Sequence, residues 1–125
     1  VALEQTAASL TLENGKPVRR HGKRAALSDA VRNLVENALR FTARGGVVTV
    51  LIDPAGAIVV RDQGPGVPAE NRERVFEPFW RASTGGGAGL GLAIVAETAA
   101  AHGGSVSVTD APGGGADFRL SLPAA

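Results

Sequence analysis

The stretch SDAVRNLVENALRFT, residues 28–42, organises the rest of the chain. At 3.6 residues per helical turn, one side of this stretch gathers the side chains that we expect to pack inward. They are Leu27, Val31, Leu34, Val35, Ala38, Leu39 and Thr42. The opposite side carries Asn33, Glu36, Asn37 and Arg40. The spacing therefore predicts an amphipathic helix with one buried face and one polar stripe.

The polar stripe is a candidate binding surface. Asn33 and Asn37 are four residues apart and Arg40 is three further on, so two amides and a guanidinium point in one direction. Such a stripe suits a metal ion and phosphates, although an ordinary solvated helix face has the same spacing. Asn is a mediocre helix former, and Lys or Glu would serve solvation better. The glycine motifs downstream decide between the two interpretations.

Length and composition predict one domain over residues 1–125. The chain has 125 residues, of which 44% are hydrophobic, and its net charge of +1 comes from interspersed acids and bases. It therefore shows neither a basic field for nucleic acid nor a basic amphipathic helix for a membrane surface. Cys is absent, which excludes disulfides and Cys-based zinc sites and agrees with a reducing cytosol. No apolar run approaches the roughly 18 residues that span a bilayer.

Local patterns predict the remaining elements. Residues 9–13 read as a strand, Asn14-Gly15 as a hairpin turn and residues 17–20 as a short return strand. The first helix begins near Arg24 or at Ser28. Residues 47–53 and 57–62 read as an antiparallel pair, and residues 105–109 and 117–122 as two final strands. One or two helical turns are expected over residues 69–76, inside a long connection.

Residues 88–102 predict a second helix that is apolar on nearly all sides and therefore buried, with Gly103-Gly104 as its C-cap. Strands around two long helices in one small domain predict an α+β fold. We expect a two-layer sandwich in which helices cover one face of a mixed, mainly antiparallel sheet. The binding site would then lie where the polar stripe faces the start of the second helix.

Two glycine motifs flank that expected site. Asp62-Gln63-Gly64-Pro65-Gly66 ends a strand, so its glycines let the backbone approach a flat group while the carboxylate accepts a hydrogen bond from it. An exposed turn is the alternative. Residues 85–91, GGGAGLG, run directly into the second helix, whose free N–H groups suit phosphate. A flexible linker is the alternative, although a linker would not pass without a break into a buried helix.

Two common phosphate-binding motifs are excluded. GxxxxGK[ST] is absent, since Gly22-Lys23 is followed by Arg24 and lacks the earlier Gly. No GxGxxG fingerprint lies between a first strand and its helix, so a Rossmann dinucleotide site is not supported. A different ATP-binding fold is left.

The motifs resemble those of the catalytic ATP-binding domain of bacterial two-component sensor histidine kinases, in the superfamily that also holds gyrase, a heat-shock chaperone and a mismatch-repair clamp ATPase. NLVENALRFT resembles the N box, DQGPGVP the first glycine box, RVFEPFWR the F box, GAGLGLAIV the second glycine box and GGGADFRLSLP the closing strand. Five boxes in order over nearly the whole chain make the resemblance specific. It implies a Bergerat fold with a mobile ATP lid at about residues 67–86.

The resemblance also implies roles for individual residues. Asn37 would be a ligand of Mg²⁺, with Asn33 beside it and Arg40 near the phosphates, and these three would be the catalytic residues. Asp62 would bind the adenine amino group, with Gly66 under the ring. Phe76 and Phe79 would belong to the lid. The remaining nucleotide contacts would be Gly64, Phe79, Arg81, Gly87, Gly89, Leu90, Gly91 and Leu92.

The implied activity is that of a protein-histidine kinase in a phosphorelay. The γ-phosphoryl of Mg-ATP would pass to a histidine on a separate dimerisation domain, with a response regulator downstream. The family's acceptor segment, His-Glu-x-x-x-Pro, is missing from residues 1–125, and we interpret His21 and His102 as structural, His102 at a helix C-terminus. We therefore expect a monomeric cytoplasmic domain of a membrane-anchored bacterial kinase that itself contacts neither membrane nor nucleic acid.

Two alternatives stay open. A clamp-type ATPase of the same superfamily would use a Glu as general base four residues before the metal-binding Asn, but Asn33 occupies that position and cannot accept the proton. A non-catalytic nucleotide-binding module would be expected to have lost Asn37, Asp62 or the glycines, and all of these are present.

Overall fold

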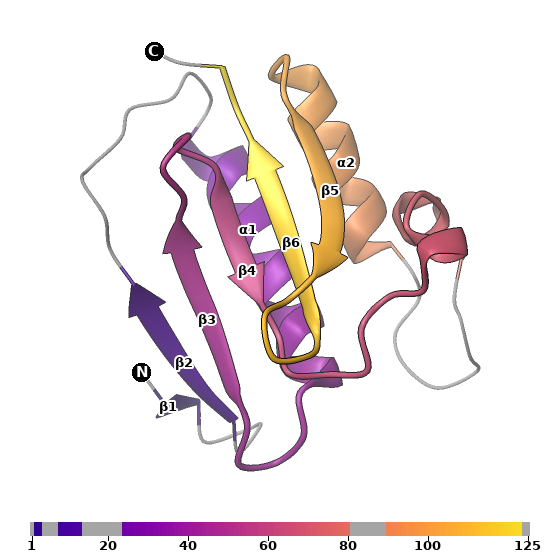
Figure 1. Cartoon of the computed structure of the whole chain (residues 1–125). Helices are drawn as coiled ribbons and strands as arrows, with labels where there is room; N and C mark the ends of the chain where they lie inside the picture. Colours follow the sequence, from indigo (N-terminus) through magenta and orange to yellow (C-terminus); the bar gives the residue numbers. More distant parts are fainter. Residues whose placement is uncertain (1, 4–7, 14–23, 81–89, 124–125) are drawn as a thin grey trace.

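A computed structural model describes residues 2–3, 8–13, 24–80 and 90–123 (Figure 1). The described strands form one sheet, and two helices cover one of its faces. In chain order the elements are β1 (Ala2–Leu3), β2 (Ala8–Glu13), α1 (Arg24–Phe41), β3 (Val47–Ile52), β4 (Ile58–Arg61), the 3₁₀ helices η1 (Ala69–Asn71) and η2 (Arg74–Phe76), α2 (Gly91–Ala101), β5 (Ser105–Asp110) and β6 (Ala116–Ser121).

The sheet is mixed and mainly antiparallel, as predicted. Its strand order is β1-β2-β3-β4-β6-β5. Only the β2–β3 pair is parallel among the described pairs, and the others are antiparallel. A parallel pair needs a long crossover, and α1 lies in the connection between β2 and β3. The four strands β3-β4-β6-β5 thus form an antiparallel unit, to which β2 and β1 add at one edge.

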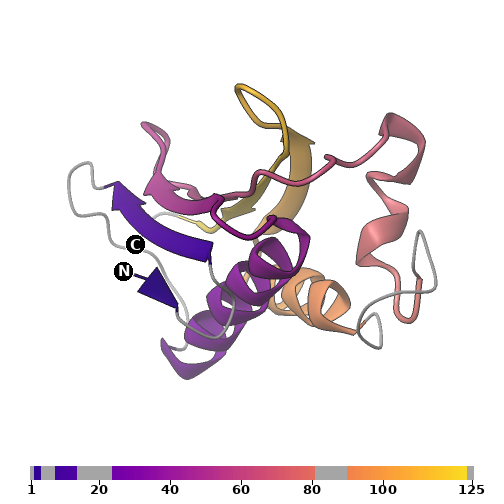
Figure 2. The same cartoon turned by 90° about the horizontal axis from the view of Figure 1, so that it is seen from below.

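The core lies between the helices and the sheet (Figure 2). Leu34 and Ala38 of α1 and Val95 and Ala99 of α2 are fully buried. They belong to the same apolar cluster as the sheet residues Val48, Val60, Phe118 and Leu120. Alternate residues of a strand point to one face, so Phe118 and Leu120 of β6 share the helix-covered face. The predicted two-layer α+β sandwich is therefore confirmed.

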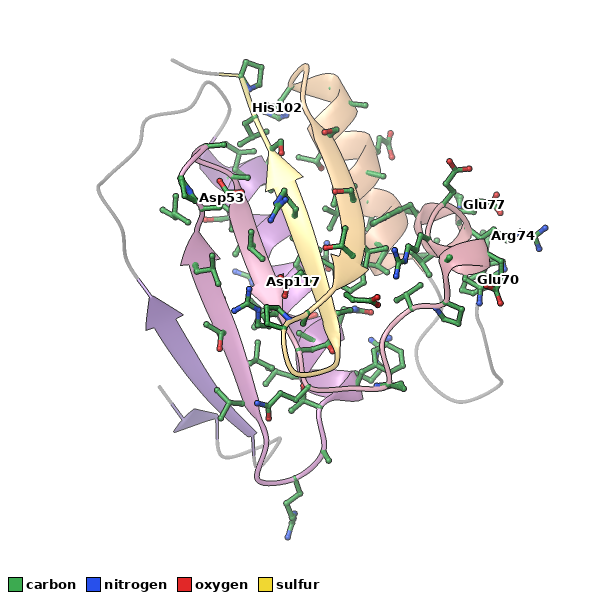
Figure 3. The ribbon with its side chains drawn as sticks, in the orientation of Figure 1. Asp53, Glu70, Arg74, Glu77, His102 and Asp117 are labelled. Carbon is green, nitrogen blue, oxygen red and sulfur yellow. The ribbon has the colours of Figure 1, made fainter. Side chains whose placement is uncertain are left out.

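The opposite face of the sheet carries charged pairs (Figure 3). Arg61 of β4 donates to both carboxylate oxygens of Asp117 on β6, at 2.8 and 3.0 Å. Arg119 of β6 lies 3.2 Å from Asp53, whose other oxygen accepts from the backbone N–H of Ala57. These pairs neutralise charged side chains on the face that no helix covers. Arg61–Asp117 links the neighbouring strands β4 and β6, and Arg119–Asp53 links β6 to the turn after β3.

Most predicted element boundaries differ from the structure by a few residues. The two β-strand pairs and the two short helical turns are confirmed. The first helix begins at Arg24, the earlier of the two predicted starts. The predicted return strand at residues 17–20 and the first part of the second helix lie outside the described residues, as does the lid beyond Trp80.

One prediction about α2 is wrong. We expected it to be buried on nearly all sides, but Ile94 is 45% exposed and Ala100 and Ala101 are exposed too. The helix lies near the β5 end of the sheet, so its outer side has no described element over it (Figure 2). Its predicted glycine C-cap is confirmed, because Gly103 has a φ of +74° and its N–H and that of Gly104 donate to Ala100 and Ala99.

Leu34→Ala should lower the free energy of unfolding by about 2–5 kcal/mol, because it opens a cavity in a fully buried site. Ile94→Ala is the matched control on the other helix, and it should cost less than about 1 kcal/mol because that side chain is partly exposed. Urea unfolding followed by circular dichroism measures both. Equal losses would contradict the assignment of the core.

Candidate functional site

Part of the polar stripe of α1 lies beside the start of the second helix, where we expected the binding site. Asn37 is only 9% exposed, Asn33 is half-buried and Arg40 is exposed. The two helices pack against one another, and the first residue of α2, Gly91, lies close to Asn33. No hydrogen bond joins the Asn37 amide to another described residue. A nearly buried amide without a partner has its donors and acceptor available to a ligand.

The structure brings the start of α2 to Asn33. A Cβ atom built on Gly91 would lie 3.7 Å from Oδ1 of Asn33, so the glycine lets the helix end come close to the amide. Leu90 is the N-cap residue and supplies no side-chain hydrogen bond. The first N–H groups of a helix have no partner within it and attract anions. The Asn33 amide of α1 therefore lies beside the N-terminal end of α2, which attracts anions.

Asp62 follows β4 and is held by backbone groups from two directions. It is 3% exposed, and its Oδ1 accepts from the N–H of Gly64 at 2.9 Å and from that of Ala116 at 3.0 Å. Its own N–H donates to the Ala116 carbonyl at 2.9 Å. The second carboxylate oxygen accepts no hydrogen bond from the described residues. It is thus fixed in position and free to accept one from a ligand.

The turn between β5 and β6 supports Asp62, a role that the sequence analysis missed. Gly113, Gly114 and Gly115 all have positive φ, at +82°, +107° and +96°. A Cβ on Gly115 would collide with the Asp62 carbonyl oxygen and lie 3.0 Å from Oδ1, whereas Gly114 has open space around it. The signal was a run of three glycines where a turn between strands needs fewer.

A second support joins α1 to the segment after β4. The Thr42 hydroxyl accepts from the Gln63 N–H at 3.1 Å, and the Gln63 side-chain oxygen accepts from the Val47 N–H at 2.9 Å. Gly64 packs against the backbone of Phe41, since a Cβ there would lie 2.7 Å from the Phe41 carbonyl oxygen. The end of α1 and the first glycine motif are therefore fixed to one another. Neither contact has a local signature in the sequence, because the partners are 16 and 21 residues apart.

A separate hollow lies on the sheet face away from the helices. Its volume is about 260 Å³, and it is lined by Val47, Thr49, Arg61, Asp62, Gln63, Gly64, Pro112, Gly113 and Gly114. Ligand pockets usually measure about 300–1,000 Å³, so this one is small for a nucleotide. No residue of α1 or α2 lines it, although it shares Asp62 and Gly64 with the site between the helices and Asp62.

The other predicted nucleotide contacts differ in how exposed they are. Phe79 is 70% exposed and has a φ of +65°, a strained value for a residue with a side chain. Leu90 is exposed, whereas Leu92 packs against the core. Gly66 approaches Gly115, since a Cβ there would lie 3.4 Å from the Gly115 carbonyl oxygen. Arg81, Gly87 and Gly89 lie outside the described residues.

Comparison with known families decides what kind of domain carries this arrangement. The family described as histidine kinase-, DNA gyrase B-, and HSP90-like ATPase matches residues 22–125. The chain belongs to this family. The family match covers both helices, the two glycine motifs and Asp62, so the site just described lies inside the matched region.

Relatives of this ATPase domain are named sensor kinases. The sensor-like histidine kinase SenX3 of Mycobacterium tuberculosis is 43% identical over 111 residues, which cover 82% of this chain and 27% of SenX3. A solved structure of the mycobacterial sensor histidine kinase MprB has a TM-score of 0.84 and 35% identity, over 95% of this chain and 83% of that one. The structure of full-length ShkA in complex with AMPPNP has a TM-score of 0.74 and 32% identity, over 97% of this chain and 27% of that one. The chain thus spans about a quarter of the length of SenX3.

Gly115→Ala should lower the free energy of unfolding by about 2–4 kcal/mol, because it adds a clash with Asp62 to the strain of a positive φ. Gly114→Ala is the matched control, with a similar φ and open space, and should cost only the strain of about 1 kcal/mol. Urea unfolding of both variants measures the difference. If the two losses are the same, Gly115 does not hold Asp62 in place.

Proposed function

We propose that this chain is the ATP-binding catalytic domain of a sensor histidine kinase, and that it delivers the γ-phosphoryl of Mg-ATP to a histidine on a separate dimerisation domain. The observation that carries the proposal is the meeting of Asn33 with the start of α2, next to the nearly buried Asn37, whose amide makes no hydrogen bond to another described residue. The kinase names of the relatives and the AMPPNP in the ShkA structure support the same assignment.

Asp62 would bind the base. Its fixed Oδ1 takes two backbone N–H groups, so the other oxygen is left to accept from a ligand donor such as the adenine amino group. Gly66, beside Gly115, would lie under the ring, where a side chain would block it. A carboxylate oxygen accepts and does not donate hydrogen bonds, so a carbonyl oxygen in that position would be repelled.

The amides of α1 fit a magnesium ion held partly by the nucleotide. Mg²⁺ prefers oxygen ligands and is usually bound by one or two protein groups together with substrate phosphates. Among the described residues no group of three His, Cys, Asp or Glu side chains is placed to hold a metal ion. The amide oxygen of Asn37 would be the protein ligand, with Asn33 beside it. When bound, the ion would neutralise charge on the phosphates during transfer.

The chain's own residues would position the phosphates and favour transfer over hydrolysis. Phosphoryl transfer needs in-line placement and charge stabilisation more than a protein nucleophile. The N–H groups at the start of α2 and the exposed guanidinium of Arg40 would supply the stabilisation. The Asn33 amide cannot take a proton from water, so a clamp-type ATPase mechanism lacks its base. When the acceptor is a histidine nitrogen and not water, this domain needs no such base.

The acceptor would come from another domain. His102 is the C-cap of α2, and its Nδ1 lies 2.7 Å from the Thr98 carbonyl oxygen, a structural arrangement. His21 lies outside the described residues. We expect the partner domain and a response regulator in the same signalling system, with this domain on the cytoplasmic side of a membrane-anchored kinase. In the described part of the chain, neither helix has the length and apolar character needed to cross a membrane.

Asn37→Ala should reduce phosphoryl transfer by about two orders of magnitude while the melting temperature changes little, because it removes the proposed metal ligand and no hydrogen bond to a described residue. Asn71→Ala on η1 is the matched control and should transfer normally. The assay mixes each variant with Mg²⁺, γ-labelled ATP and a histidine-bearing dimerisation domain. Full transfer by a folded Asn37→Ala variant would refute the metal-ligand role.

Asp62→Asn should weaken ATP binding and narrow the preference for ATP over GTP. In this variant the amide oxygen can keep the contacts to Gly64 and Ala116. The amide NH2 group then takes the place of the free carboxylate oxygen and donates where the oxygen accepted. An unmatched buried pair costs about 1–3 kcal/mol, or one to two orders of magnitude in affinity. Asp117→Asn is the control, since that buried carboxylate pairs with Arg61 and should affect stability alone. Competition binding of ATP and GTP to each variant measures the preference. If Asp62→Asn keeps the wild-type preference for ATP, Asp62 does not bind the base.

A further inference from the structure

Arg72, which lies outside the quoted nucleotide-site motifs, joins the end of the first glycine motif to the sheet. Its Nε donates to the Val67 carbonyl at 3.2 Å, and its Nη2 donates to Oδ1 of Asp110 at 2.9 Å. Val67 directly follows Gly66, and Asp110 is the last residue of β5. One planar guanidinium therefore ties the segment after the first glycine motif to the end of the sheet.

The bridge closes a ring of contacts around Asp62. In the sheet, Asp110 pairs with Ala116, and Ala116 exchanges two hydrogen bonds with Asp62. From Asp62 the chain runs through Gly64 and Gly66 to Val67, where Arg72 returns to Asp110. In the described part of the chain, Arg72 supplies the side-chain hydrogen bonds that join residues 63–68 to β5. The Val67 side chain adds only partial burial against the core.

We propose that Arg72 is a positioning residue of the base pocket, which holds Gly66 and Val67 at a fixed distance from Asp62. The inference rests on the proposed function, because it assigns the base to the space between Asp62 and Gly66. The ion pair itself contributes little to stability, since Asp110 is largely exposed and screened by solvent. Its effect is on geometry, because without it the carbonyl of Val67 loses its donor and the segment is free to shift.

Arg74 provides a matched control two residues away. It has no ion pair with the described residues, and Figure 3 shows it pointing away from the sheet near Glu70 of η1 and Glu77, which follows η2. Arg72→Met and Arg74→Met remove the same charge from the same segment. Arg72→Lys keeps the charge but cannot reach both acceptors in one planar fork, so it should recover only part of the effect.

Calorimetric titration with ATP, ADP and AMP tests the proposal. Arg72→Met should weaken all three by the same factor, about three- to tenfold, because the phosphates are not involved, and its melting temperature should match that of Arg74→Met within about 3 °C. Arg74→Met should bind like the wild type. Equal affinities in the two Met variants would overturn the proposal, as would a loss that grows with the number of phosphates.

Hydrogen exchange at the Gly64 amide tests the role of Arg72 without any nucleotide. The Gly64 N–H donates to Asp62, so its amide should exchange faster in Arg72→Met than in Arg74→Met or the wild type. Unchanged exchange at Gly64 would show that Arg72 does not position this segment. Failure of the wild type to bind any adenine nucleotide would instead overturn the proposed function, and the exchange result would stand separately.

Discussion

The hydrogen bonds to Oδ1 of Asp62 are the constraint on which the candidate site depends. The donors come from Gly64, two residues on, and from Ala116, 54 residues away. A carboxylate oxygen that accepts two N–H groups has a fixed orientation, so the position of the second oxygen is determined by the backbone. The approach of Ala116 requires that residue 115 have no Cβ. The contact between Asp62 and Ala116 thus requires a glycine at residue 115, in a turn far from Asp62 in the sequence.

The two layers of the fold serve different ends. On the helix side, apolar residues of α1 and α2 pack on the sheet, and this packing brings Asn33 to the start of α2. On the other side, Arg61 and Asp117 form a bidentate pair that is half-hidden from solvent. Pairs of that kind add specificity to strand register more than net stability. The core therefore builds the site, while the charged face helps to fix the strands that carry it.

The sequence predicted those features whose signals are local. Helical periodicity located α1, local strand patterns located β2, β3, β4, β5 and β6, and the glycine motifs indicated where the backbone approaches another group closely. The sequence placed the polar stripe beside the start of the second helix but did not predict how far Asn37 is buried, because a helical wheel shows the side on which a residue lies and not how closely other elements pack there. The exposure of Ile94 was missed because an apolar pattern predicts burial even where no described element covers the side chain. The Arg72–Asp110 and Thr42–Gln63 contacts link residues 38 and 21 apart, and nothing in either local pattern announces them.

The parallel pairing of β2 with β3 has a consequence for where this domain can be shortened. β2 covers one edge of the four-stranded antiparallel unit, and its register runs from Ser9 opposite Val47 to Glu13 opposite Leu51. A chain that began at α1 would keep every element named in the site but expose the backbone of β3. That strand reads VVTVLI, which has high β-propensity, no charge and no Pro, the profile of an edge that recruits further strands and aggregates. β2 thus covers an edge of the sheet that would otherwise be open to pairing with another copy of the chain.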